Sequence, residues 1–198
     1  SVAQDGHLIV HGDLNFKTER YDSRDNHKMS VKSLPKDFDT IEIKGRIEPE
    51  NIAYFANLHR ELKTHLNDDI LIFPTSHQKD FALKELKCTS LDFTGNGNIT
   101  EKLPQSLQRL CFSDNQTLSA LPPLPEKCRS ITFCNTTMQG KANLPDNIKT
   151  FTANKAIFEE IPAFAQDMEY FSLRDTEFKQ GSNINFGNCA ELQLQNIK

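Results

Sequence analysis

A motif of about 20 residues recurs along this chain of 198 residues and constrains its fold more than any other feature. Its clearest copies begin with Leu-Pro pairs at positions 103–104, 124–125 and 144–145, each followed by apolar residues at similar offsets. The central apolar residues lie at intervals of 21, 19, 21, 20, 20 and 21 residues and are Ile70, Leu91, Leu110, Ile131, Phe151, Phe171 and Leu192. Recurrence at such a period predicts a solenoid, in which each repeat packs against its neighbours.

Each repeat also carries the alternation of a short strand. Another apolar or small residue stands two positions after every central residue, from Ile72 to Leu194. Because the side chains of a strand alternate between two faces, these positions predict one strand per repeat with one buried face. Asn96 and Asn115 stand five residues after their central residues, where an asparagine side chain can hydrogen-bond the backbone of the turn.

The pattern LPxxLxxLxFxxN, together with LPPLP at positions 121–125, resembles the short leucine-rich repeat of IpaH-like and YopM-like bacterial effectors. The resemblance covers roughly residues 86–198 and, more weakly, residues 33–43. It implies an α/β leucine-rich-repeat solenoid, in which a curved parallel β-sheet of about seven to eight repeats of about 20 residues dominates and a helix lies near the N-terminus. It also implies a protein secreted by a bacterium and translocated into the host cell cytosol, where it binds a host protein in virulence. We expect no cleavable signal peptide.

Two regions differ from the regular repeats. Residues 1–32 contain HLIVHGDLNF at positions 7–16 and then a charged stretch, which predict one or two cap strands followed by a loop. The solenoid then spans residues 33–198, with an insertion at residues 48–66 whose apolar residues recur every three or four positions after Pro49. This spacing predicts a helix that packs on the early repeats. The last repeat has no obvious cap, which favours a longer parent protein over an irregular cap.

Composition excludes several classes of function. The chain has 23 Lys and Arg against 27 Asp and Glu, a net charge of −4, whereas a general nucleic-acid or anionic-membrane binder would have a basic surplus. No apolar run approaches the roughly 18 residues of a membrane span. We therefore expect no nucleic-acid partner and no membrane insertion, and we expect a monomer.

The five cysteines fall into two sets. Cys88, Cys128 and Cys189 occupy an inward position of the repeat, where they are expected to act as small core hydrophobes. Cys111 and Cys134 alternate with inward residues and are expected on the exposed face of the strands. Free thiols on a surface indicate a reducing compartment such as the cytosol.

The exposed face of the predicted sheet, which is the concave face of a leucine-rich-repeat solenoid, is the candidate partner-binding surface. Basic residues in nearly equivalent places of three successive repeats predict a stripe that binds an acidic patch or peptide. Tyr170 beside Arg174 is the strongest single anchor, because Tyr and Arg are enriched at binding hot spots. For any one residue, however, a merely solvated sheet face is favoured. The candidate residues are Asp92, Arg109, Arg129, Thr132, Lys149, Thr152, Asn154, Tyr170 and Arg174, of which Arg109, Arg129 and Lys149 form the stripe.

Catalysis is not indicated. All six histidines precede Cys88, so a Cys–His pair with a later thiol is not expected in a solenoid. The chain has no GxxxxGK, HExxH or CxxC motif, and the Cys-x-Asp setting of IpaH-like ubiquitin ligases has only CAE at residues 189–191 as its nearest counterpart. We expect a non-enzymatic module without cofactor or metal. Two alternatives stay open: the substrate-recognition part of a larger enzyme such as a ubiquitin ligase, and a small hydrolase or transferase using Cys111 or Cys134.

Overall fold

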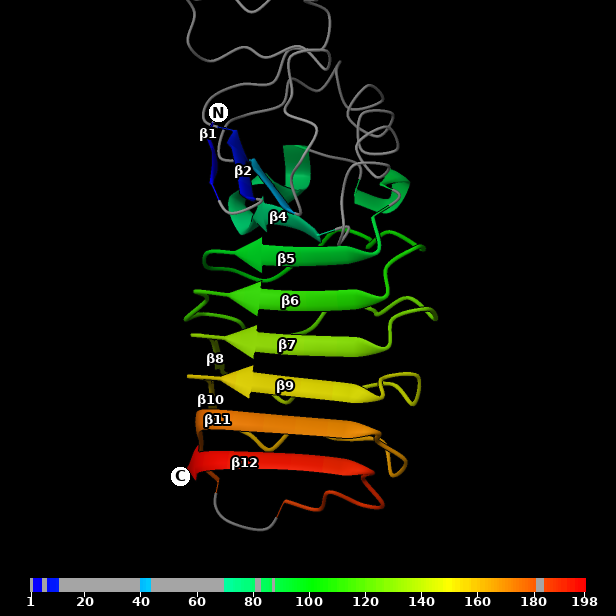
Figure 1. Cartoon of the computed structure of the whole chain (residues 1–198), viewed down its shortest axis with the longest axis vertical. Coiled ribbons are helices and arrows are strands. Elements are labelled where there is room, and N and C mark those ends of the chain that lie inside the picture. The colour runs from blue at the N-terminus through cyan, green and yellow to red at the C-terminus, as the bar shows by residue number, and fades with distance from the viewer. Residues whose placement is uncertain are drawn as a thin grey trace, which may run out of the picture.

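The residues that the structure describes form a parallel β-solenoid of about five turns with almost no helix (Figure 1). The structure is a computed structural model that describes residues 2–4, 7–10, 40–43, 70–80, 83–86, 88–180 and 184–198. Within these ranges the strands are β1 (Val2–Gln4), β2 (His7–Val10), β3 (Thr40–Ile43), β4 (Ile70–Pro74), β5 (Ser90–Thr94), β6 (Arg109–Ser113), β7 (Ser130–Cys134), β8 (Thr137–Met138), β9 (Thr150–Asn154), β10 (Ile157–Phe158), β11 (Tyr170–Phe178) and β12 (Glu191–Ile197). Two short 3-10 helices, η3 (Thr75–Asp80) and η4 (Leu83–Glu85), follow β4.

One long sheet runs the length of the solenoid. Its strands lie in the order β1-β2-β3-β4-β5-β6-β7-β9-β11-β12, and every neighbouring pair is parallel except the antiparallel hairpin of β1 and β2. In Figure 1, β5, β6, β7, β9, β11 and β12 lie as successive rungs. A second, short parallel ladder joins β8, β10 and the C-terminal end of β11. Each regular turn therefore has one main strand; two turns add a second strand after it, and in a third turn the end of β11 takes that place.

The register of the main sheet places the repeated apolar residues in two buried columns. Leu91, Leu110 and Ile131 are paired in one column, and Phe93, Phe112 and Phe133 in the other. All six side chains are essentially inaccessible to solvent. The predicted alternation of inward and outward side chains is thus confirmed for β5, β6, β7, β9 and β11, and burial of these large side chains is the main stabilising term of each of these turns.

Phenylalanine rings form a continuous ladder inside the solenoid. Ring centroids of Phe93 and Phe112 lie 6.0 Å apart, and those of Phe112 and Phe133 lie 5.8 Å apart, both stacked. In the next turn Ala153 pairs with Phe133 in the sheet, and the ring of Phe158 fills the space, 5.2 Å from Phe133. Such contacts between aromatic rings add about 0.5–1.5 kcal/mol each beyond their area burial.

Six main strands each have a residue with left-handed backbone conformation, directly after β5, β6, β7 and β9 and within β11 and β12, where the chain turns toward the next side of the solenoid. The residues are Gly95 (φ 94°), Asp114 (φ 56°), Asn135 (φ 45°), Lys155 (φ 53°), Asp175 (φ 49°) and Asn196 (φ 50°). Asn, Asp and Gly tolerate this conformation, whereas it is costly for other residues. The periodic use of Asn and Asp after the strands is therefore a requirement of the turn.

Asn115 has the role expected from its place in the repeat. It is fully buried, and its Oδ1 accepts a hydrogen bond from the backbone N–H of Thr117 at 3.0 Å. Asn96 differs, because it is exposed and its Oδ1 accepts from the backbone N–H of Gln116 in the following turn at 2.7 Å. The asparagine interpretation is thus confirmed for the turn at residue 115, while Asn96 links neighbouring turns.

Three expectations about the solenoid need correction. The count of about seven to eight repeats is too high: the sheet does continue from β4 to β2, but Leu8, Ile41 and Leu71 are paired at spacings of 33 and 30 residues, not 20. The α/β class is wrong for the described residues, which contain only η3 and η4 as helices. The helix expected at residues 48–66 lies outside the described residues.

The third correction concerns the register of β4. Leu71 and Phe73 pair with Leu91 and Phe93, so they occupy the two columns that the sequence had assigned to Ile70 and Ile72. Phe73 is 1% exposed, and its ring lies 5.9 Å from that of Phe93. A slip of one residue exchanges the two faces of a strand, so the phenylalanine ladder decides the register.

Candidate functional site

The outer face of the main sheet, opposite the buried columns, is the candidate site. It comprises three columns of side chains that cross β5, β6, β7, β9, β11 and β12. The first column holds Ser90, Arg109, Ser130, Thr150, Tyr170 and Glu191; the second holds Asp92, Cys111, Thr132, Thr152, Ser172 and Gln193; the third holds Thr94, Ser113, Cys134, Asn154, Arg174 and Gln195. Apart from Ser90, these residues are half-buried or exposed.

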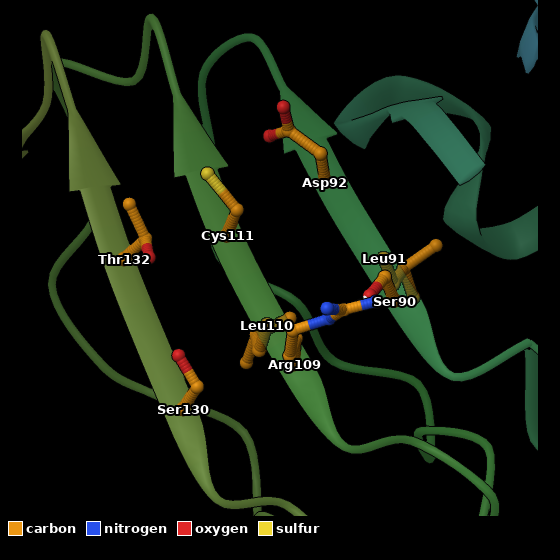
Figure 2. A pocket seen from close by; sticks show the side chains of 8 residues that line it. All are labelled: Ser90, Leu91, Asp92, Arg109, Leu110, Cys111, Ser130 and Thr132. Carbon is orange, nitrogen blue, oxygen red and sulfur yellow. Dashed lines mark hydrogen bonds between the residues drawn. The ribbon is translucent and has the colours of Figure 1, made fainter. Parts of the chain in front are cut away.

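A shallow pocket of about 220 Å³ lies on this face over β5, β6 and β7 (Figure 2). Asp92 lies at one side of the pocket and Thr132 at the other, with Cys111 between them on β6. The side chain of Arg109 extends toward β5, where its Nε donates a hydrogen bond to Oγ of Ser90. The pocket thus offers a guanidinium group, a carboxylate, a thiol and hydroxyl groups within one small area.

Hydrogen bonds between neighbouring strands order the polar groups of this region. Oγ of Ser113 donates to Oδ1 of Asp92 at 2.8 Å, and Sγ of Cys111 lies 3.5 Å from the same Oγ. The carboxylate, the hydroxyl and the thiol therefore form one network across β5 and β6. Such a network fixes the side chains in position before any partner arrives.

The three basic residues predicted to form a stripe do not lie in one column. The backbone N–H of Arg129 donates to the carbonyl of Gln108, and that of Lys149 donates to the carbonyl of Arg129, so Arg129 and Lys149 share a column just outside the strands. Arg109 lies one position further along, in the first column of the outer face. The structure therefore separates one arginine on the face from two basic residues at its rim.

Lys149 is engaged in an ion pair at this rim. Its Nζ lies 2.6 Å from Oδ2 of Asp167, and only 18% of its side chain is exposed. The hydrogen bond and the positive charge of Lys149 hold the pKa of the Asp167 carboxyl below its usual value. The charge of Lys149 is thus partly balanced, which leaves Arg129 as the more available cation of the rim.

The remaining predicted residues lie on the outer face. Tyr170 and Arg174 are both on β11, but they occupy the first and third columns and are separated by four residues, or about 13 Å along a strand. They are therefore not the adjacent pair that the sequence suggested. Asn154 lies between Cys134 and Arg174 in the third column, and its Oδ1 is buried without a hydrogen-bond partner among the described residues. Thr132 and Thr152 are neighbours in the second column.

The sequence did not reveal that the two exposed thiols are neighbours. Cys134 pairs in the sheet with Ser113, so it lies diagonally beside Cys111 on the next strand. A hydrogen bond between the thiols lowers the pKa of Cys134 and, with burial and the charge of Asp92, raises that of Cys111. The separation of 23 residues is one repeat of 21 plus two, which is the signal that would have predicted this diagonal contact.

Of the other three cysteines, two lie in the core as expected. Cys88 and Cys128 are fully buried in the core, where burial raises the pKa of Cys128 to about 11. Cys189 is half-buried in the last turn. All five cysteines are free thiols.

Comparison with known proteins identifies no relative: no family model, curated protein or solved structure matches the chain. Among the described residues, no helix is long and apolar enough to cross a membrane. No group of three or more His, Cys, Asp and Glu side chains in these same ranges is arranged to hold a metal ion.

Proposed function

We propose that this chain is a leucine-rich-repeat interaction module of a translocated bacterial effector, and that it binds a host protein through the outer face of its sheet. The observation that supports this proposal best is the outer face itself, which presents three ordered columns of polar side chains over six strands. Solenoids commonly use an extended surface of this kind for binding.

The size of the face indicates what a partner must contact. Six strands about 4.8 Å apart and about five residues long span roughly 24 by 16 Å, or about 400 Å² in projection. A stable interface buries about 800 Å² on each partner. A partner that binds the face therefore extends onto the rim, where Arg129 and Lys149 lie. The basic residues thus contact the partner in two parts of the interface, Arg109 on the face and Arg129 with Lys149 at the rim.

A protein partner with acidic groups fits this arrangement. Arg109 is exposed on the face, and Arg129 is exposed at the rim, although the chain as a whole has a net charge of −4. Guanidinium groups bind carboxylates through paired, charge-assisted hydrogen bonds. The two arginines would thus select an acidic patch on the partner and orient it across β6 and β7.

The test is a quantitative pull-down from eukaryotic cytosol with four versions of the chain. Arg109→Glu changes the face, Arg129→Glu/Lys149→Glu changes the rim, and Lys141→Glu is a control with the same charge change as Arg109→Glu at an exposed residue between β8 and β9. Each variant must first unfold at the same urea concentration as the wild type. We expect a specific protein retained by the wild type and by Lys141→Glu, and lost from both other variants.

Equal retention by all four versions would refute binding through this surface. If only the rim variant failed to retain the protein, the contact would be confined to the rim, and the proposal that the outer face binds the partner would be contradicted. The partner identified in this way should then bind the purified chain directly, with an affinity that falls as salt is raised, because the contacts are between charges.

A further inference from the structure

The pair of thiols on the outer face has the geometry of a small ligand site. Cys111 lies in the second column on β6 and Cys134 in the third column on β7, and both are half-buried. Figure 2 shows the sulfur of Cys111 pointing away from Asp92 and toward β7, the strand that carries Cys134. The two side chains share one face of the sheet, because their strand partners Thr132 and Ser113 also lie on that face.

A direct disulfide does not fit this placement. Diagonal neighbours are separated by one strand spacing of about 4.8 Å and by two residues of about 3.3 Å each, so their Cα atoms lie about 8 Å apart. Cysteines whose Cα atoms are more than about 7 Å apart cannot be joined without movement of the backbone. Movement is restricted here, because Phe112 and Phe133, next to the two cysteines, are fully buried in the ring ladder. A single atom inserted between the sulfurs would bridge them without such movement.

We infer that Cys111 and Cys134 form a two-coordinate site for one soft, thiophilic cation of the copper(I) class. Thiolates select such ions over the hard cations that prefer oxygen ligands. Two metal–sulfur bonds of about 2.3 Å span at most about 4.6 Å, which is close to one strand spacing of about 4.8 Å, so small rotations of the two side chains can bring the sulfurs to this separation. A tetrahedral zinc site needs four ligands, and no group of three or more suitable side chains occurs in the described residues.

Binding is a ligand exchange that needs no oxidant or reductant. Two S–H bonds break, two Cu–S bonds form, and two protons are released, so the bound unit carries one net negative charge. Ser113 supports the site, because its hydroxyl contacts the sulfur of Cys111 at 3.5 Å and donates to Asp92 at 2.8 Å. Such outer hydrogen bonds orient metal ligands. The inference stands on the thiol geometry and does not depend on the proposed function.

The test is a titration of the reduced, folded chain with copper(I) under anaerobic conditions, in competition with a chromophoric copper(I) chelator. The variants keep the outer face intact: Cys111→Thr introduces the residue found at Thr132 in the same column, and Cys134→Ser introduces the residue found at Ser113 in its column. Cys189→Ser removes a half-buried thiol outside the pair and is the control. Circular dichroism must show that all variants are folded.

We expect one copper(I) per chain in the wild type and in Cys189→Ser, with ultraviolet thiolate-to-copper charge-transfer absorption. Each variant of the pair should bind at least about a hundredfold more weakly, since loss of a ligand exceeds the 10–100-fold effect of losing an outer hydrogen bond. The inference is overturned if the wild type binds copper(I) no more tightly than Cys111→Thr and Cys134→Ser do. A Cys111–Cys134 disulfide formed in air by the folded chain would also overturn it, because the sulfurs would then close directly.

Discussion

Replacement of Asn115 by alanine is expected to weaken the solenoid by removing hydrogen bonds in two neighbouring turns. Asn115 is fully buried after β6. Its Nδ2 donates to the carbonyl of Gly97 at 2.8 Å, and its Oδ1 accepts from the N–H of Thr117 at 3.0 Å and, more weakly, from the N–H of Gly97 at 3.4 Å. One side chain therefore supplies hydrogen bonds to its own turn and to the preceding turn.

The magnitude follows from these bonds. Each good hydrogen bond contributes about 1 kcal/mol net, and a donor or acceptor left unsatisfied in the interior costs about 1–3 kcal/mol. Gly97 is half-buried and Thr117 exposed, so water can reach their backbone groups in part. Asn115→Ala should thus lower the free energy of unfolding by about 2–3 kcal/mol. Asn115→Thr should cost about 1–2 kcal/mol, because hydroxyls at the equivalent Thr136 and Thr176 bond the carbonyl two residues earlier at 2.8 and 2.9 Å.

The assay is urea unfolding followed by far-ultraviolet circular dichroism, with the shift in midpoint compared at constant slope. Amide hydrogen exchange gives a local measurement, because the N–H of Thr117 loses its acceptor in both variants. Gln139→Ala is the control: this exposed side chain makes one hydrogen bond, to the carbonyl of Gln116 at 3.2 Å, and should change stability by less than about 0.5 kcal/mol. A loss for Asn115→Ala no larger than that of the control would refute the reasoning.

Three further predictions test other parts of the molecule. Lys155→Gly should raise the free energy of unfolding, measured by urea titration, by about 0.5–1 kcal/mol. A non-glycine residue in the left-handed conformation costs about 1–2 kcal/mol, and the larger unfolded-state entropy of glycine offsets part of the gain from removing it. Destabilisation by this substitution would contradict the prediction. Leu173→Ala should lower the free energy of unfolding by about 2–5 kcal/mol, whereas Leu194→Ala in the same column should lower it by about 1 kcal/mol or less. The reason is that the two side chains are 1% and 50% exposed. Equal losses of stability would contradict this dependence on burial. The pKa of the Asp167 carboxyl should lie below its usual range by NMR and return toward that range in Lys149→Ala, so the contribution of this ion pair is complete above the unfolded pKa and is lost as pH falls through the folded one; an unchanged midpoint in the variant would count against the pair.

The period of the sequence predicts the columns of the solenoid well wherever strands alternate clearly. On β6 the apolar residues Leu110 and Phe112 alternate with polar or small residues, so only one face of the strand can be buried. On β4 the run ILIF is apolar throughout, and alternation cannot choose between its faces. The contact of Phe73 with the next ring decides the register there, and that contact is a tertiary effect.

Burial at the last strand departs from the same pattern for a related reason. Leu192 and Leu194 occupy the two inward columns, yet they are 44% and 50% exposed. In the described residues β12 pairs with β11 alone, so its inward side chains contact one neighbouring turn instead of two. Burial in a solenoid depends on both neighbours of a turn, and a single repeat read from the sequence cannot report it.

The candidate site shows the limit of sequence reasoning more sharply. The period located Arg109, Arg129 and Lys149 to within one residue, but one residue decides whether a side chain lies on the outer face or at its rim. The same period predicted that Cys111 and Cys134 are exposed, while their contact depends on pairing between strands. Exposure follows from position within one repeat, whereas adjacency follows from the register between repeats.

The outer face consists of two halves that a partner would meet differently. Over β5, β6 and β7, Ser113 bonds Asp92 and Arg109 bonds Ser90, so these polar groups are satisfied before binding. Over β9 and β11, no side-chain hydrogen bond joins Thr152 or Tyr170 to another described residue. A partner that covers unsatisfied groups must supply matching donors and acceptors, because a buried polar group without a partner is costly. The half of the face around Tyr170 therefore adds a requirement for matching donors and acceptors to the acidic groups that Arg109 and Arg129 would bind over β6 and β7.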